Sequence, residues 1–293
     1  MNGLRDAARL LLYLAATVLL GALVAPPLFW FSRWLAAHGW FTLLLQFDFE
    51  TFFHRALLIS ALMFVWPLFK SLRLQSRAAL DLPVNAHWLR DSAAGFAIAA
   101  LPLLLAETII LTLRVYTFRG SIDWREVGAL TLTSLLVPLI EESLFRGLIL
   151  GLLLRSCRAW AAAMATSALF AVVHFLKAPA GTSVEPTWYA GFISIGHAFE
   201  QFREPMLVLG GFSTLFTIGY ILADARLRTR SLWLPIGLHA GWIFSSGLFN
   251  RMARREFVAL PWLGKNLLVG IAPLCVALIT WWIMRQWLAR STH

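Results

Sequence analysis

Residues 10–35 read LLLYLAATVLLGALVAPPLFWFSRWL, an apolar stretch in which Arg33 is the one charged residue. A helix that crosses the hydrocarbon core of a bilayer needs about 20 consecutive, mainly apolar residues. The stretch is long enough for this, and it exceeds the roughly 7–15 residues of the apolar core of a cleavable signal peptide. We therefore expect it to be retained as a membrane-spanning helix.

The composition of the chain extends this prediction to the whole protein. Of the 293 residues, 59% are hydrophobic and 14% are charged, and the mean hydropathy is +0.73. A typical soluble domain has about 25% charged residues. This balance argues against a soluble enzyme and a disordered tail. Two cysteines, Cys157 and Cys275, are too few for a disulfide framework.

The apolar stretches predict an all-α fold, a polytopic transmembrane bundle with about eight spanning helices in a single membrane domain over residues 1–293. The second predicted span is short unless it begins near Phe49, and the fourth is long enough to be tilted or to break near Pro138. The predicted spans are Leu10–Leu35, Ala56–Phe69, Ser92–Leu113, Val127–Leu154, Ala159–Leu176, Met206–Ala223, Leu232–Phe249 and Leu267–Leu288.

The net charge of +10 comes from 25 Lys and Arg against 15 Asp and Glu. The basic residues form short clusters between apolar stretches, such as Arg226, Arg228 and Arg230. This arrangement is typical of membrane-flanking anchors, and it leaves no basic face long enough to follow a nucleic acid backbone. We therefore expect a lipid bilayer as partner and no nucleic acid. The distribution of basic residues slightly favours an N-terminus inside.

The connection from Lys177 to Pro205 is the longest stretch without a clear span, and it carries Trp188, Tyr189 and Phe199 among Gly, Pro and Ser. Aromatic residues in such a context are compatible with a re-entrant or interfacial segment. An ordinary loop with a membrane-facing aromatic edge explains the pattern equally well.

The fourth predicted span contains VPLIEESLFRG, residues 137–147, and so places two carboxylates and a guanidinium in an apolar stretch. A charge inside the bilayer costs about 2.5–3.5 kcal/mol on insertion scales, so such residues are candidates for function. Glu142 and Arg146 are four residues apart, which places them on one helix face where they can pair. Glu141 points about 100° away and is the candidate general base.

Two further predicted spans contain a histidine. His174 follows Phe170 by four residues, so an aromatic ring flanks the imidazole, and His239 lies beside the small residues Ala240 and Gly241. If the three helices converge, a carboxylate and an imidazole can deprotonate a water molecule while the second imidazole stabilises an oxyanion. Each feature alone is also explained by structural hydrogen bonding or pairing between helices.

These motifs resemble the signatures of the CAAX-processing and bacteriocin-processing (Abi) family of intramembrane proteases. The resemblance covers residues 127–249, and residues 1–126 carry none of it. It rests on Glu141-Glu142-x-x-x-Arg146, on Phe170-x-x-x-His174 and on the histidine motif at His239.

The resemblance implies a helical membrane bundle with a cavity open to membrane and water. It implies that Glu141 and His174 activate the attacking water, that Glu142 and Arg146 support the site, and that His239 binds the developing oxyanion. It also implies a metal-free glutamate mechanism without a cofactor. A catalytic zinc ion needs three protein ligands, so Zn²⁺ held by Glu141, His174 and His239 is the alternative.

The third motif departs from the family pattern, which usually has Asn four residues after the histidine. Ile243 stands at that position and cannot donate a hydrogen bond. Loss of one oxyanion donor typically costs about 10²–10³ in rate. Ser246 lies near the same helix face as His239, two turns away, and is a candidate substitute that would need a bend or a water molecule.

We therefore expect an intramembrane endopeptidase that cleaves a peptide or a membrane-anchored protein, with prenylated tails and leader peptides among the possible substrates. The compact chain favours the plasma membrane of a prokaryote. A non-catalytic membrane scaffold or immunity protein with a decayed site is the alternative that Ile243 favours. A transporter or proton relay would also use buried Glu and His, but no inverted halves are evident.

Overall fold

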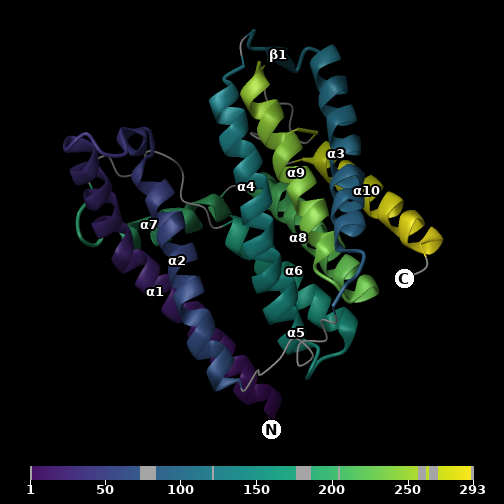
Figure 1. The fold of residues 1–293 in the computed structure, drawn as a ribbon, viewed down its shortest axis with the longest axis horizontal. Helices are drawn as coiled ribbons and strands as arrows, with labels where there is room; N and C mark the ends of the chain where they lie inside the picture. Colours follow the sequence, from purple (N-terminus) through teal and green to yellow (C-terminus); the bar gives the residue numbers. More distant parts are fainter. Residues whose placement is uncertain are drawn as a thin grey trace. The chain divides into compact units, whose positions relative to one another are not determined.

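A computed structural model describes residues 2–72, 84–120, 122–175, 186–203, 205–256, 262–263 and 270–291. Within them the chain is almost entirely helical, as the apolar stretches predict, and one short antiparallel pair of strands is present (Figure 1). The elements are α1 (Asn2–Ala37), η1 (Thr42–Gln46), α2 (Phe49–Ser71), α3 (Trp88–Thr112), β1 (Tyr116–Phe118), α4 (Trp124–Glu142), η3 (Ser143–Ile149), α5 (Leu150–Leu153), α6 (Ala159–Phe175), α7 (Ala190–Glu200), η4 (Gln201–Arg203), α8 (Pro205–Thr229), α9 (Trp233–Met252), β2 (Ala253–Arg255) and α10 (Ile271–Arg290).

Each predicted span corresponds to a helix, and five helices in the described residues are long and apolar enough to cross a membrane. The number of about eight spans is therefore approximate. The helix α2 begins at Phe49, where the Asp48 side chain accepts a hydrogen bond from the Thr51 amide and caps the first turn. The five segments are Ala8–Ala37, Phe49–Ser71, Trp88–Thr112, Val208–Thr229 and Ile271–Arg290.

The fourth predicted span differs from expectation in where it changes geometry. Pro138 lies within α4, which continues to Glu142. The change follows in η3, a seven-residue π-helical segment, before one short turn of α-helix in α5. A break near Pro138 is therefore the wrong alternative, and the wider helical turn begins directly after the paired glutamates.

The residues form two compact units, Met1–Gln75 with Val173–Pro205, and Ser76–Val172 with Met206–His293. In the first unit, α1 and α2 pack antiparallel, with Gly21 facing Leu57 and the Tyr13 hydroxyl donating to the Ala61 carbonyl. The helix α7 packs on this hairpin through Ala190. The connection from Lys177 to Pro205, for which the sequence allowed either a loop or a re-entrant or interfacial segment, thus contains the helix α7. Residues 176–185 lie outside the described residues.

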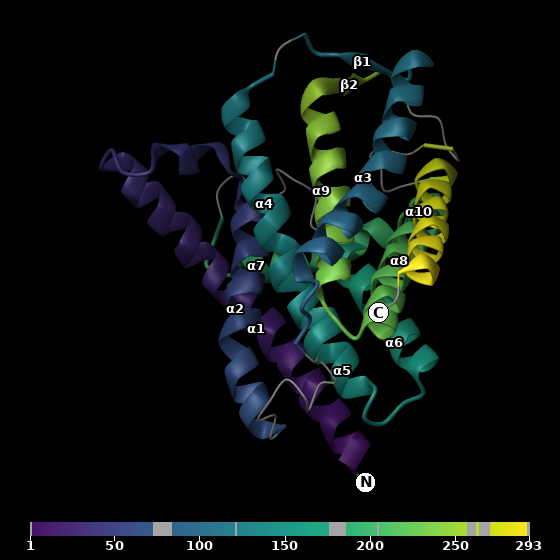
Figure 2. The same ribbon diagram turned by 45° about the vertical axis from the view of Figure 1, so that its right-hand side comes forward.

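In the second unit, α9 lies between α4 and α3 (Figure 2). The helices α3 and α9 run parallel in close contact, because Gly95 faces Leu234 and Leu238, and Gly241 faces Phe96. A side chain at these glycines would separate the two backbones. The strands β1 and β2 pair beside the ends of these helices, with Tyr116 opposite Arg255.

Gly237 provides the test of this close contact, because a Cβ atom there would overlap the backbone of Ser92. We expect Gly237→Ala to lower the free energy of unfolding by about 1–3 kcal/mol, since the two helices must move apart. Thermal unfolding in detergent micelles measures the effect.

Gly128 in α4 is the matched control, because a Cβ atom there meets nothing within 4 Å. Gly128→Ala should be neutral or stabilise by up to about 1 kcal/mol, since alanine favours a helix more than glycine does. Equal effects of the two substitutions would contradict close packing as the role of Gly237.

Candidate active site

A cluster of ionisable side chains lies inside the second unit, at the junction of α4 with η3 and against α9. The relative exposure of both Glu142 and Arg146 is 0%, and that of His239 is 6%. Glu142 ends α4, Arg146 lies in η3, and His239 lies in the second turn of α9. Buried charges at such a depth are stable only when they are paired and hydrogen-bonded, so the contacts of each group decide its role.

The pair predicted between Glu142 and Arg146 is present. Arg146 Nη1 lies 3.0 Å from Glu142 Oε1, and Arg146 Nη2 donates to the Gly219 carbonyl on α8 at 3.0 Å. The guanidinium carbon lies 4.4 Å from the centroid of the Phe170 ring on α6. The arginine therefore joins η3 to α8 and α6 through an ion pair, a hydrogen bond and a cation–π contact.

The same carboxylate oxygen also receives His239. The distance from His239 Nδ1 to Glu142 Oε1 is 2.8 Å, although the two residues are 97 positions apart in the chain. An ionised carboxylate only accepts hydrogen bonds, so we assign the proton of the neutral imidazole to Nδ1. Glu142 thereby fixes both the orientation and the tautomer of His239, and the ring nitrogen Nε2 is left facing away from Glu142.

Glu141 is the accessible member of the two glutamates. Its side chain is 22% exposed, whereas that of Glu142 is 0% exposed. Glu141 Oε2 lies 3.9 Å from His239 Nε2, which is too long for a direct hydrogen bond. A single oxygen atom can lie within hydrogen-bond distance of both groups. The adjacent carboxylates thus have different environments, one fully buried in an ion-pair network and one partly exposed.

Phe170 contacts the cluster through His239, whereas the sequence places it beside His174. Its ring packs edge-on against His239, with 5.9 Å between the ring centroids, and edge-on against Phe145 at 5.3 Å. The sequence placed Phe170 beside His174 because the two are one helical turn apart. The contact with His239 joins two helices that are distant in the chain, so no local spacing indicates it.

His174 lies in the last turn of α6, and its exposure is intermediate. The boundary between the two compact units falls within α6, so His174 belongs to the first unit while Glu141 and His239 belong to the second. Its approach to Glu141 remains a prediction.

Neither Ile243 nor Ser246 directs a hydrogen-bond donor to the cluster through its side chain. The isoleucine side chain has none, and the Ser246 hydroxyl donates to the Trp242 carbonyl of its own helix at 2.7 Å. The support that the sequence predicted from Ser246 therefore stays a prediction. The sequence did not predict that Glu142 contacts His239. The one feature of the sequence that could have indicated this contact is that buried ionisable groups in separate spans tend to pair.

Among the described residues, no group of three or more His, Cys, Asp or Glu side chains is arranged to hold a metal ion. Zn²⁺ held by Glu141, His174 and His239 stays a prediction, because His174 belongs to the first unit and the other two residues belong to the second.

The ion pair can be tested by removing one partner. We expect Glu142→Gln to lower the free energy of unfolding by about 3–5 kcal/mol, because Arg146 then remains buried without a counter-charge. The measurement is the midpoint of thermal unfolding in detergent, together with the yield of folded protein.

A double variant, Glu142→Gln with Arg146→Met, separates charge from packing. It should recover part of the loss, because it also removes the uncompensated charge. A single variant as stable as the unmodified protein would contradict the structural role of the pair.

Comparison with known proteins gives a match to one family model. Residues 123–245 match the family model for type II CAAX prenyl endopeptidases, Rce1-like, and the matched region contains Glu141, Glu142, Arg146, His174 and His239. Neither a curated protein sequence nor a solved structure matches the chain. Residues 123–245 are thus similar to CAAX-type intramembrane proteases, as is consistent with the CAAX-processing and bacteriocin-processing family.

Proposed function

We propose that this multi-pass membrane protein hydrolyses a peptide bond in a membrane-associated substrate, of prenylated or leader type, in the plasma membrane of a prokaryote. The observation that carries the proposal is the accessible Glu141 beside His239 Nε2, next to a second glutamate that is fully buried. A general base must be open to the water molecule that it activates, whereas a group that orients a histidine need not be.

In the proposed reaction a water molecule lies between Glu141 and the scissile carbonyl. Glu141 accepts a proton from the water as the oxygen attacks the carbonyl carbon, and the proton is then delivered to the leaving amine. His174 assists as the second group that the family resemblance assigns to water activation. The C–N bond breaks when the tetrahedral intermediate collapses, which yields a carboxylate and an amine.

The orientation of His239 limits how it can stabilise the oxyanion. Because Nδ1 donates to Glu142, Nε2 carries a proton only when the ring is an imidazolium. We propose that His239 acts in this charged form, and that the Glu142 carboxylate stabilises it electrostatically. A charged donor would partly offset the missing side-chain donor at Ile243.

A non-catalytic scaffold or immunity protein is the second candidate, and Ile243 is the observation that favours it. The retained cluster of Glu141, Glu142, Arg146 and His239 argues for catalysis, because three buried ionisable groups are costly to keep in a membrane protein. The two candidates differ in one measurable property, the release of new peptide termini.

We expect Glu141→Gln and His174→Ala each to abolish cleavage, since the first removes the proton acceptor and the second its assisting imidazole. New peptide termini in native membranes that contain the unmodified protein or a variant provide the measurement. Termini that depend on both residues would also identify the substrate.

Glu126→Gln is the matched control, because Glu126 is a surface glutamate of the same helix, 60% exposed and 3.5 Å from Arg251. It should leave the terminus profile unchanged. Identical profiles for the unmodified protein and Glu141→Gln, at equal levels of folded protein, would favour the scaffold.

We further propose that the reaction needs no metal ion, so cleavage should persist after treatment with EDTA or phenanthroline. Elemental analysis of active protein is the direct measurement. Stoichiometric zinc in the active fraction, together with loss of activity on its removal, would contradict the metal-free mechanism and favour Zn²⁺ at Glu141, His174 and His239.

A further inference from the structure

The segment Trp188–Arg203 in the first unit is amphipathic, and the proposed reaction gives it no role. The buried side of α7 consists of Ala190, Gly191, Ser194 and Ala198. Gly191 lies against the backbone of Ala22 on α1, so small residues let α7 approach the α1–α2 hairpin closely. One face of α7 therefore packs closely against the two membrane-spanning helices α1 and α2, and the opposite face is exposed.

That other face is strongly aromatic. Phe199 and Phe202 stack on each other with 6.1 Å between ring centroids, and both are exposed, at 54% and 41%. Trp188 is 66% exposed. Exposed aromatic side chains next to membrane-spanning helices are typical of the interface between lipid headgroups and acyl chains. This face is thus suited to contact lipid.

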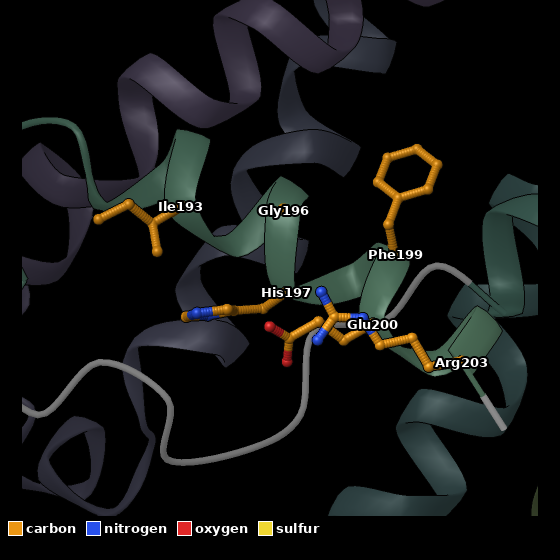
Figure 3. Close-up of a pocket in the computed structure, with 6 residues that line it drawn as sticks. All are labelled: Ile193, Gly196, His197, Phe199, Glu200 and Arg203. Carbon is orange, nitrogen blue, oxygen red and sulfur yellow. The ribbon is translucent and has the colours of Figure 1, made fainter.

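A hollow of about 510 Å³ opens on this segment, within the size range of small-molecule sites. Figure 3 shows the charged ends of Glu200 and Arg203 and the ring of His197 directed into it. Its described lining is Ile193, Gly196, His197, Phe199, Glu200 and Arg203.

One polar group of this hollow, the ring of His197, is not satisfied by the described part of the protein. His197 Nδ1 is buried and has no hydrogen-bond partner there. No ion pair joins Glu200 to Arg203 within the same residues, although they are three positions apart. A buried polar atom without a partner indicates that a further group completes the site.

We propose that the hollow binds the headgroup of an ethanolamine phospholipid. The Arg203 guanidinium receives the phosphate, which it can bind with two hydrogen bonds, and the Glu200 carboxylate accepts hydrogen bonds from the primary ammonium. His197 adds a hydrogen bond to the phosphate, and Ile193 and Phe199 contact the start of the acyl chains.

The pair of opposite charges is what selects this ligand. A headgroup that carries only negative charge would be repelled by Glu200, and a choline headgroup offers no N–H donors to that carboxylate. Gly196 leaves room for the ligand, because a Cβ atom there meets nothing within 4 Å. The site is independent of the proposed protease reaction, so either proposal can fail without the other.

The test is a lipid titration of the delipidated full chain in detergent, followed by native mass spectrometry. The lipids are dioleoyl ethanolamine, choline and glycerol phospholipids, and free phosphoethanolamine is added as a competitor. We expect one ethanolamine lipid to bind at least about tenfold more tightly than the other two lipids, since a charge-assisted hydrogen bond contributes that much.

Gly196→Leu is expected to block binding by filling the hollow, whereas Gly128→Leu, at another helical glycine with open space around it, should leave binding unchanged. Arg203→Gln and Glu200→Gln should each weaken ethanolamine lipid binding about tenfold. Weakening by both variants supports a zwitterionic ligand.

Four results would overturn the proposal. Equal binding of choline and ethanolamine lipids would remove the role of Glu200, and stronger glycerol lipid binding by Glu200→Gln would indicate a simple anion site. Free phosphoethanolamine that binds as tightly as the lipid would indicate a soluble ligand. Retention of tight binding by Gly196→Leu would show that the lipid binds elsewhere.

Discussion

The ion pair between Glu142 and Arg146 is the contact on which the arrangement of the candidate active site depends. Both groups are fully buried, so neither is stable alone. The pair also holds parts that are distant in the chain, since Arg146 bonds the Gly219 carbonyl and Glu142 bonds His239. An interaction of this kind contributes to specificity of structure, because any other packing would leave a charge uncompensated.

The two adjacent glutamates illustrate how helix geometry separates two tasks. Consecutive residues point about 100° apart, so one carboxylate can be enclosed while its neighbour stays accessible. The π-helical segment that begins at Ser143 follows both, and such wide turns are frequent at functional sites. Glu142 is thereby enclosed beside His239, and the side chain of Glu141 stays partly exposed.

The sequence predicted the helices well because most of the apolar stretches are long and continuous. It predicted the Glu142–Arg146 pair because four-residue spacing in a helix is local geometry. It did not predict the wide turn of η3, because Pro138 was the stronger local signal for a break and yet lies within α4. The contacts of Phe170 with His239 and of Glu142 with His239 join different helices, and no spacing along the chain encodes them.

The sequence by itself determined that this is a helical membrane protein and which ionisable residues lie in its apolar stretches, because hydropathy and helical spacing are local properties of the chain. Residues 123–245 are similar to CAAX-type proteases. Only the tertiary structure decided that Glu142, rather than Glu141, orients His239, and that α9 lies between α3 and α4. Those relations depend on how helices pack, and close approach at glycines and charge pairing between helices fix that packing.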